Sequence, residues 1–332
     1  MNYHDHKNAI KLSFPELELH LLDESEFQSF KNENFAKQYI NSCIELCNNA
    51  SDKLEININF GVKYDYSSNA QATVKGKRGV ILLNLGLIEK LESIISDSIE
   101  IFSMENVSRL TIQENDKTEL KALLSDLCFS YIFYHELAHI LQLTNASSDG
   151  YHNFQELYIY ENKFDVRKHL YEIDADNFGI CMSMSKLIDY ASNKNYPIST
   201  VLIFNLLTLF VFSIANIIIE FSKNQFNDIY YKSHSHPHPL IRIVKCSERI
   251  VSFASDNLNI KEELSYVVLQ RSVTMMSQIQ YSNGVIDYLK LLQDNISDIE
   301  IYNNEIEVLN ESYRELIRFR IQKLFNSLLI SK

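Results

Sequence analysis

The chain has 332 residues, 46% of them hydrophobic and 22% charged, which is the composition of a soluble globular protein with a sizeable core. Only 7 Gly and 4 Pro are present, too few for the turns of a many-stranded β protein, so long helices are expected. The formal net charge of −12 argues against nucleic acid or an anionic membrane as the main partner, because an acidic surface repels both.

The cysteines and the N-terminus both predict a cytoplasmic protein. The five cysteines are an odd number without a CxxC pair, which is typical of reduced thiols rather than of a disulfide framework. Residues 1–22 contain no continuous apolar stretch and no small-residue cleavage site, so secretion is not expected.

The first part of the chain carries the expected sheet. A helix is predicted near residues 34–49. Residues 54–66 alternate as a strand does, with Leu54, Ile56 and Ile58 on one face. The segment SSNAQATVKGKRG then supplies loop residues, and GVILLNLGLI follows as a second strand that runs into a helix starting near Gly86.

The rest of the chain is predicted to be helical. Residues 116–143 are apolar nearly all round and predict one long buried helix, followed by another helix over about 165–190. Residues 201–219 contain no charge and are long enough for a membrane span. Polar residues along one side and the lack of a basic N-terminal flank favour a buried core helix, with the span left open. Residues 240–330 are typical of amphipathic helices.

Two histidines and a glutamate interrupt the apolar stretch YIFYHELAHILQL, residues 131–143. On a helix, His135 and His139 stand on one face about 5–6 Å apart at Cβ and can bind one metal ion, a spacing that suits tetrahedral Zn²⁺. Glu136 can reach a water molecule at such an ion and act as general base, as in H-E-x-x-H hydrolases. The alternative is a pair of core histidines satisfied by backbone carbonyls, with a stray glutamate.

The sequence beyond the second histidine indicates which third ligand to expect. The three-histidine form of the motif is excluded, because Gln142 and Asn145 occupy the positions of its Gly and His. The other arrangement takes a glutamate from a downstream helix, and the stretch YEIDADNFG, residues 171–179, offers Glu172.

Other residues accompany Glu172 in this prediction. Asp176 lies one helical turn later and would accept a hydrogen bond from the non-ligating nitrogen of a histidine ligand. His152 and His169 are rival third ligands. An acidic helix face in water is the alternative interpretation of the cluster.

The order H-E-L-A-H followed by E-x-D-A-D resembles the gluzincin metallopeptidases, and within them most closely the M48-type branch. Residues 68–91, in which an Asn-Ala pair precedes a strand and a Gly-Leu helix start, are similar to an upstream segment of that branch. SHPHPLIR, residues 235–242, resembles its downstream [ST]-H-P-x-x-x-x-R pattern. The resemblance covers roughly residues 54–245 and implies a zincin-like fold with one Zn²⁺ per chain.

The same resemblance implies roles for further residues. His236 would face the scissile carbonyl and stabilise its oxyanion, and Arg242 would brace the site; a solvated His/Pro loop is the alternative for this segment. The second predicted strand would be the edge on which the substrate is laid as an added β-strand. The residues of this expected edge are Val80, Ile81, Leu82, Leu83 and Asn84.

The predicted fold is therefore α+β and predominantly α-helical. It consists of a zincin-like metallopeptidase domain with a small N-terminal sheet, preceded by a helical segment and followed by a helical C-terminal annex; the expected ranges are 54–256, 1–53 and 257–332. The membrane helices usual at the edges of the M48-type branch are missing, unless residues 201–219 are one. A soluble relative, such as the Lit-type phage-exclusion peptidases, is the alternative within this class.

These residues together predict a zinc-dependent endopeptidase that acts on a protein or peptide through metal-activated water, with Glu136 as general base. One alternative is a catalytically inactive metal-binding or interaction protein that retains the fold. Intact Glu136 argues against it, because a structural metal site gains nothing from a base there. Another is a membrane-embedded protease that uses residues 201–219 as a span.

Overall fold

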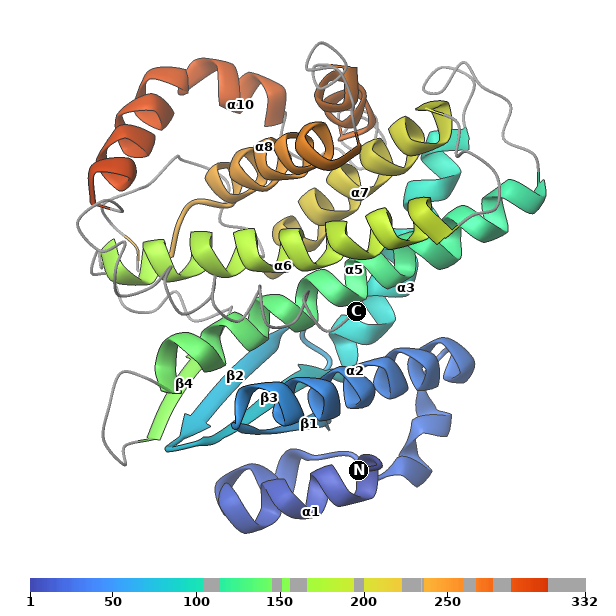
Figure 1. The fold of residues 1–332 in the computed structure, drawn as a ribbon, viewed down its shortest axis with the longest axis vertical. Helices are drawn as coiled ribbons and strands as arrows, with labels where there is room; N and C mark the ends of the chain where they lie inside the picture. Colours follow the sequence, from blue (N-terminus) through green and yellow to red (C-terminus); the bar gives the residue numbers. More distant parts are fainter. Residues whose placement is uncertain are drawn as a thin grey trace. The chain divides into compact units, whose positions relative to one another are not determined.

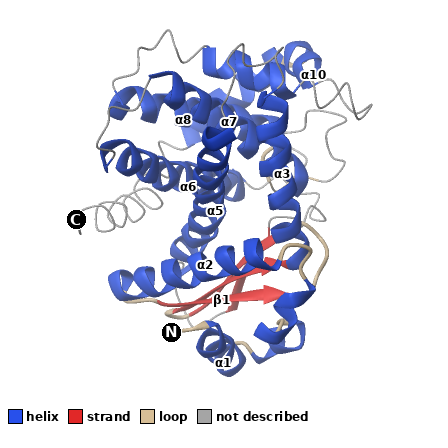
Figure 2. Ribbon diagram, turned by 90° about the vertical axis from the view of Figure 1, so that its right-hand side faces the viewer, coloured by secondary structure: helices blue, strands red, loops and turns tan. Residues whose placement is uncertain are grey.

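The computed structural model describes residues 1–103, 114–144, 151–155, 166–193, 200–222, 234, 236–258, 267–276 and 288–309. These residues are mostly helical and include one small sheet (Figures 1 and 2), which confirms the predicted α+β, predominantly α-helical class. The chain divides into two compact units, which differ from the three predicted segments. The first comprises residues 1–92, 132–158 and 313–332, and the second comprises residues 93–131 and 159–312.

The first unit begins with short helices that the sequence itself caps. Helix α1 (Tyr3–Ser13) starts with a capping box, in which the Asn2 side chain accepts from the Asp5 amide and Asp5 accepts in return. Two 3₁₀-helices, η1 (Pro15–His20) and η2 (Glu24–Ser29), lead to α2 (Glu33–Leu54). Helix α2 extends beyond the predicted range and stops where Glu55 adopts a left-handed conformation with φ of 53°.

The sheet contains four strands in the order β1-β3-β2-β4. They are β1 (Asn57–Lys63), β2 (Ala70–Lys75), β3 (Arg78–Asn84) and β4 (Tyr151–Gln155). Strand β1 is parallel to β3, whereas β2 is antiparallel to both β3 and β4. The prediction of a loop over residues 67–79 was wrong, because β2 lies there. A tight turn with Gly76 at φ of 61° joins it to β3.

The expected substrate edge is also wrong. Strand β3, which contains residues 80–84, pairs with β1 on one side and with β2 on the other, so it lies inside the sheet. Its backbone groups are already used by those two neighbours and cannot bind a further strand. In the described sheet the outer strands are β1 and β4.

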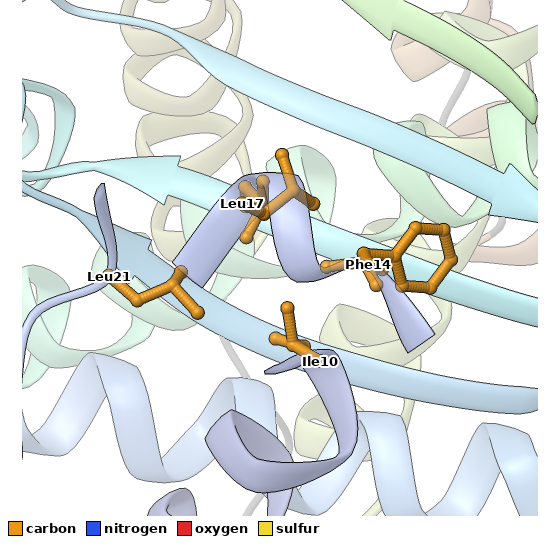
Figure 3. Packing of buried hydrophobic residues seen from close by; sticks show 6 residues of the cluster. Ile10, Phe14, Leu17 and Leu21 are labelled. Carbon is orange, nitrogen blue, oxygen red and sulfur yellow. The ribbon is translucent and has the colours of Figure 1, made fainter. Parts of the chain in front are cut away.

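The N-terminal helices cover one face of the sheet with apolar side chains (Figure 3). Ile10 and Phe14 are fully buried and pack in one cluster with residues from η1 and β3. A Cβ on Gly61 of β1 would lie 2.9 Å from Leu21 Cδ2 and 3.1 Å from Ile10 Cδ1, so the glycine lets this cluster pack closely on the sheet. The cluster consists of Ile10, Phe14, Leu17, Leu21, Val80 and Leu82.

The second unit is helical. Its core helices are α6 (Val166–Asn193), α7 (Thr200–Phe221) and α8 (Pro239–Leu258), and α8 packs against both α6 and α7 (Figure 1). Helix α10 (Tyr288–Asp294) and helical residues 267–276 and 296–309 follow. Two helices, α3 (Leu85–Ser103) and α5 (Glu114–Thr144), contribute residues to both units. The remaining parts of the predicted helical region 240–330 lie outside the described residues.

Helix α7 contains residues 201–219, for which a membrane span is the alternative to a core helix. It is long and apolar enough to cross a membrane by length and composition, but most of it is buried within the structure. Two of its polar side chains have partners there: Thr208 donates to the Phe204 carbonyl at 2.8 Å, and the Ser213 and Ser98 hydroxyls lie 3.0 Å apart. Hydrogen-bonded polar groups of this kind are typical of a buried helix in a protein core.

Candidate metal centre

Helix α5 presents two imidazoles on one buried face. His135, Glu136 and His139 are each at most 2% exposed. The Nε2 atoms of His135 and His139 lie 3.0 Å apart, with their ring planes at 84°. Because the residues are four apart in one helix, the local helical geometry alone brings the two nitrogens together. At this separation they can share one proton or bind one metal ion.

Gln142 fixes the orientation of the His139 ring. The Nδ1 atom of His139 lies 2.8 Å from Gln142 Oε1, and since an amide oxygen only accepts, Nδ1 is the donor. In the neutral ring the lone pair is then on Nε2, the nitrogen that points at His135. In the sequence, Gln142 is notable first because it excludes the three-histidine motif. Its spacing of three residues from His139 on a helix would have indicated this contact.

In the second unit, Arg242 of α8 holds two carboxylates of α6. Its Nε donates to Asp176 Oδ2 and its Nη2 to Asp176 Oδ1, both at 2.8 Å, and its Nη1 lies 3.5 Å from Glu172 Oε2. Glu172, Asp176 and Arg242 are 0%, 2% and 4% exposed. The bidentate pair makes Arg242 a brace between two helices, in keeping with the role that the resemblance implies for it.

Asp176 has a contact that sequence analysis missed. The hydroxyl of Tyr131, on α5, donates to Asp176 Oδ1 at 2.8 Å. Tyr131 lies one turn before His135 and therefore on the same face of that helix. This spacing could have indicated that Tyr131 belongs to the site. The predicted hydrogen bond from a histidine ligand to Asp176 stays a prediction.

The His/Pro segment before α8 lies beside the carboxylates. The Nε2 of His236 is 3.6 Å from Glu172 Oε1, and the His236 side chain is 13% exposed. His238 has a different role: its Nδ1 accepts a hydrogen bond from the Leu240 amide at 3.2 Å and so caps the start of α8. Burial of the ring is the main reason why the pKa of His238 is lowered to about 4, and the nearby His234 lowers it further. Ser235 of the predicted motif lies outside the described residues.

The two rival ligands are not equivalent. Both ring nitrogens of His169 are engaged, Nδ1 with the Tyr302 hydroxyl at 2.7 Å and Nε2 with the His234 carbonyl at 2.8 Å. His169 therefore has no nitrogen available to a metal ion in this structure. His152 lies on β4, and its side chain is outside the described part of the chain.

The donor set on α5 fits a zinc ion. Two nitrogens at 2.0–2.1 Å from a tetrahedral ion would be separated by about 3.3 Å, close to the 3.0 Å between the two Nε2 atoms. The partner on Nδ1 of His139 is also of the kind that metal-binding histidines have. His135, His139 and Glu172 are buried groups of types that could hold a metal ion.

No family model, no curated protein and no solved structure matches the chain. The likeness to gluzincin peptidases therefore rests on the residues of the motifs alone.

Proposed function

We propose that the chain is a zinc-dependent endopeptidase in which His135, His139 and Glu172 bind one Zn²⁺ and Glu136 acts as general base. The observation that carries this proposal is the pair of buried Nε2 atoms 3.0 Å apart on the helix that also carries Glu136. A metal ion explains why such groups stand in the otherwise apolar stretch of α5 from Leu127 to Leu141, because buried polar groups are costly without compensation.

Helix α5 links the two halves of the proposed centre. It is continuous from Glu114 to Thr144, and within it Tyr131, which binds Asp176, lies one turn before His135. Tyr131 and the two histidines share one face of α5, and Tyr131 binds Asp176 on α6. Glu172 lies one turn before Asp176 on α6, and this placement supports it as the third ligand.

The buried charges of the second unit favour a cation. Glu172 and Asp176 both lie against the guanidinium of Arg242, and His236 also lies near Glu172. Buried carboxylates are usually paired or bind metal. A divalent ion at Glu172 would stabilise its negative charge further.

Each residue would have a separate part in peptide hydrolysis. A bound Zn²⁺ would supply Lewis-acid chemistry, by lowering the pKa of a water molecule and polarising a carbonyl. Glu136 would take the proton from the attacking water and pass it to the leaving amine. His236 would donate a hydrogen bond to the carbonyl oxygen as it becomes negative, and Arg242 would hold Glu172 and Asp176 in place.

A protein or peptide is the proposed substrate, and the cytoplasm the proposed location, in keeping with the reduced cysteines and the net charge of −12. Helix α7 is proposed to be a core helix rather than a membrane span, because most of it is buried and its Thr208 and Ser213 hydroxyls have hydrogen-bond partners.

Three variants of the full chain test this function. We expect one zinc per chain in the wild type, loss of zinc in His139→Ala and retention of zinc in Glu136→Gln, measured by elemental analysis after purification. Cleavage of a peptide library should fall by about 10²–10⁴-fold in Glu136→Gln. Glu100→Gln, an exposed acid on α3, is the matched control and should change neither quantity. Zinc retained in His139→Ala would overturn the ligand assignment.

A further inference from the structure

His169 is a buried titratable residue that the proposed mechanism does not use. It lies on α6, three residues before Glu172, and is 0% exposed. Its Nε2 is 2.8 Å from the main-chain oxygen of His234, and its Nδ1 is 2.7 Å from the hydroxyl of Tyr302, which is itself 1% exposed. The imidazole thus joins three segments: helix α6, the His/Pro segment and the helix over residues 296–309.

The direction of these hydrogen bonds follows from their chemistry. A carbonyl oxygen only accepts, so Nε2 of His169 carries the proton and donates to His234. In the neutral ring Nδ1 then has the lone pair and accepts from the Tyr302 hydroxyl. The His234 carbonyl therefore selects the tautomer of His169, and the Tyr302 hydroxyl holds the ring in that tautomer by donating to Nδ1.

The hydrogen bond between His169 and the His234 carbonyl anchors one side of the segment that carries His236. On the N-terminal side, the His234 carbonyl is bound by His169; on the C-terminal side, the His238 ring caps α8 through the Leu240 amide. His236 lies between the two anchors, with its Nε2 3.6 Å from Glu172 Oε1.

We propose that His169 and Tyr302 are positioning residues for His236, so that the C-terminal helix over residues 296–309 is required to place the group that stabilises the oxyanion. The catalytic meaning of this inference rests on the proposed function, but the anchoring of the segment does not. A misplacement of about 1 Å in a reacting group can lower a rate by about 100-fold, so the loss of an anchor should be visible in the rate.

The experiment measures the reactivity of His236 in the full-length protein with zinc. Diethylpyrocarbonate modifies accessible imidazoles, and mass spectrometry gives the rate at His236 separately from the other histidines. Three variants are compared with the wild type: Tyr302→Phe removes only the hydroxyl, His169→Phe removes both hydrogen bonds, and His169→Gln keeps a side-chain N–H that can donate to the carbonyl. Zinc content, Tm, kcat and KM are measured on the same samples.

We expect His169→Phe to raise the modification rate of His236 by about 10-fold and to lower kcat by about 10–100-fold, with KM and zinc content nearly unchanged. Tyr302→Phe should change both quantities in the same direction but by less. His169→Gln should have a His236 modification rate and a kcat close to those of the wild type. Tyr3→Phe is the matched control: it removes a buried hydroxyl that bonds Leu22 and Val62 in the first unit, so it should lower Tm without changing His236 reactivity.

Each result decides the proposal. If His169→Phe lowers Tm but leaves both the His236 modification rate and kcat as in the wild type, the contact is only structural and the positioning role is wrong. A fall in kcat without a change in modification rate would also overturn it, since the effect would then act elsewhere. If the wild type cleaves no peptide, the proposed function fails, while the modification rates still test the anchoring of the segment.

Discussion

Two buried regions of this protein are equally shielded from water but differ in what they need. Ile10 and Phe14, under the sheet, pack among aliphatic side chains, and burial itself is what stabilises them (Figure 3). Glu172, Asp176 and Arg242 are as well buried, yet each needs a charged or polar partner in a defined place. A small gap in the apolar cluster should therefore cost about 1 kcal/mol, whereas removal of one member of the buried ionic group should cost several times more.

The largest expected effect comes from breaking the ionic group. Arg242→Met would leave Glu172 and Asp176 buried without the guanidinium and should lower the free energy of unfolding by about 4 kcal/mol. Urea denaturation in the presence of a chelator measures this. The double variant Arg242→Met/Asp176→Asn removes one carboxylate as well and should recover part of the loss. An equal loss in the double variant would mean that packing rather than charge decides the stability there.

A second effect depends on pH and on His238. Its pKa is about 4 in the folded protein, below its ordinary value near 6.5, because the ring is buried. Above pH 6.5 both states carry the neutral ring. As the pH falls from 6.5 to 4 the unfolded chain gains a proton that the folded protein does not, so stability should fall by about 3 kcal/mol.

Denaturant unfolding at pH 7, 5.5 and 4 measures this slope, and His238→Asn, which keeps a capping side chain, should reduce it. The slope should not vanish, because burial also lowers the pKa of His6. If His238→Asn has the same pH dependence as the wild type, His238 does not cause the loss of stability at low pH.

A third effect concerns metal affinity alone. Gln142→Ala removes the acceptor on Nδ1 of His139 and should weaken zinc binding by about 10–100-fold without abolishing it. Competition with a chromophoric chelator gives the dissociation constant. Gln38→Ala, at an exposed position on α2, is the matched control and should leave zinc affinity unchanged. Wild-type affinity in Gln142→Ala would show that the ring orientation does not depend on this amide.

The smallest effect is expected in the apolar region. Ile10→Val removes one methylene group from a fully buried side chain and should lower the free energy of unfolding by about 1 kcal/mol. Zinc should stabilise this variant by the same increment as the wild type, because the metal ligands are untouched. Thermal denaturation with and without zinc tests both points, and an altered zinc increment would contradict the independence of the two regions.

The features that depend only on interactions within one helix can be predicted from the amino-acid sequence. The apolar run around the histidines predicts a long buried helix, and α5 covers Glu114–Thr144. The spacing of His135 and His139 predicts that their side chains meet, and their Nε2 atoms lie 3.0 Å apart. Both follow from the 3.6-residue period of a single helix, which needs no information from distant parts of the chain.

Strand pairing and side-chain contacts between segments far apart in the sequence became known only from the tertiary structure. Residues 70–75 form a strand because β3 and β4 lie on either side of them, and β3 became an inner strand for the same reason. Arg242 reaches Asp176 across 66 residues of sequence, and His169 reaches Tyr302 across 133. Periodicity shows which face of an element is buried, but it does not show which other segment will cover that face, because many pairings bury the same apolar area.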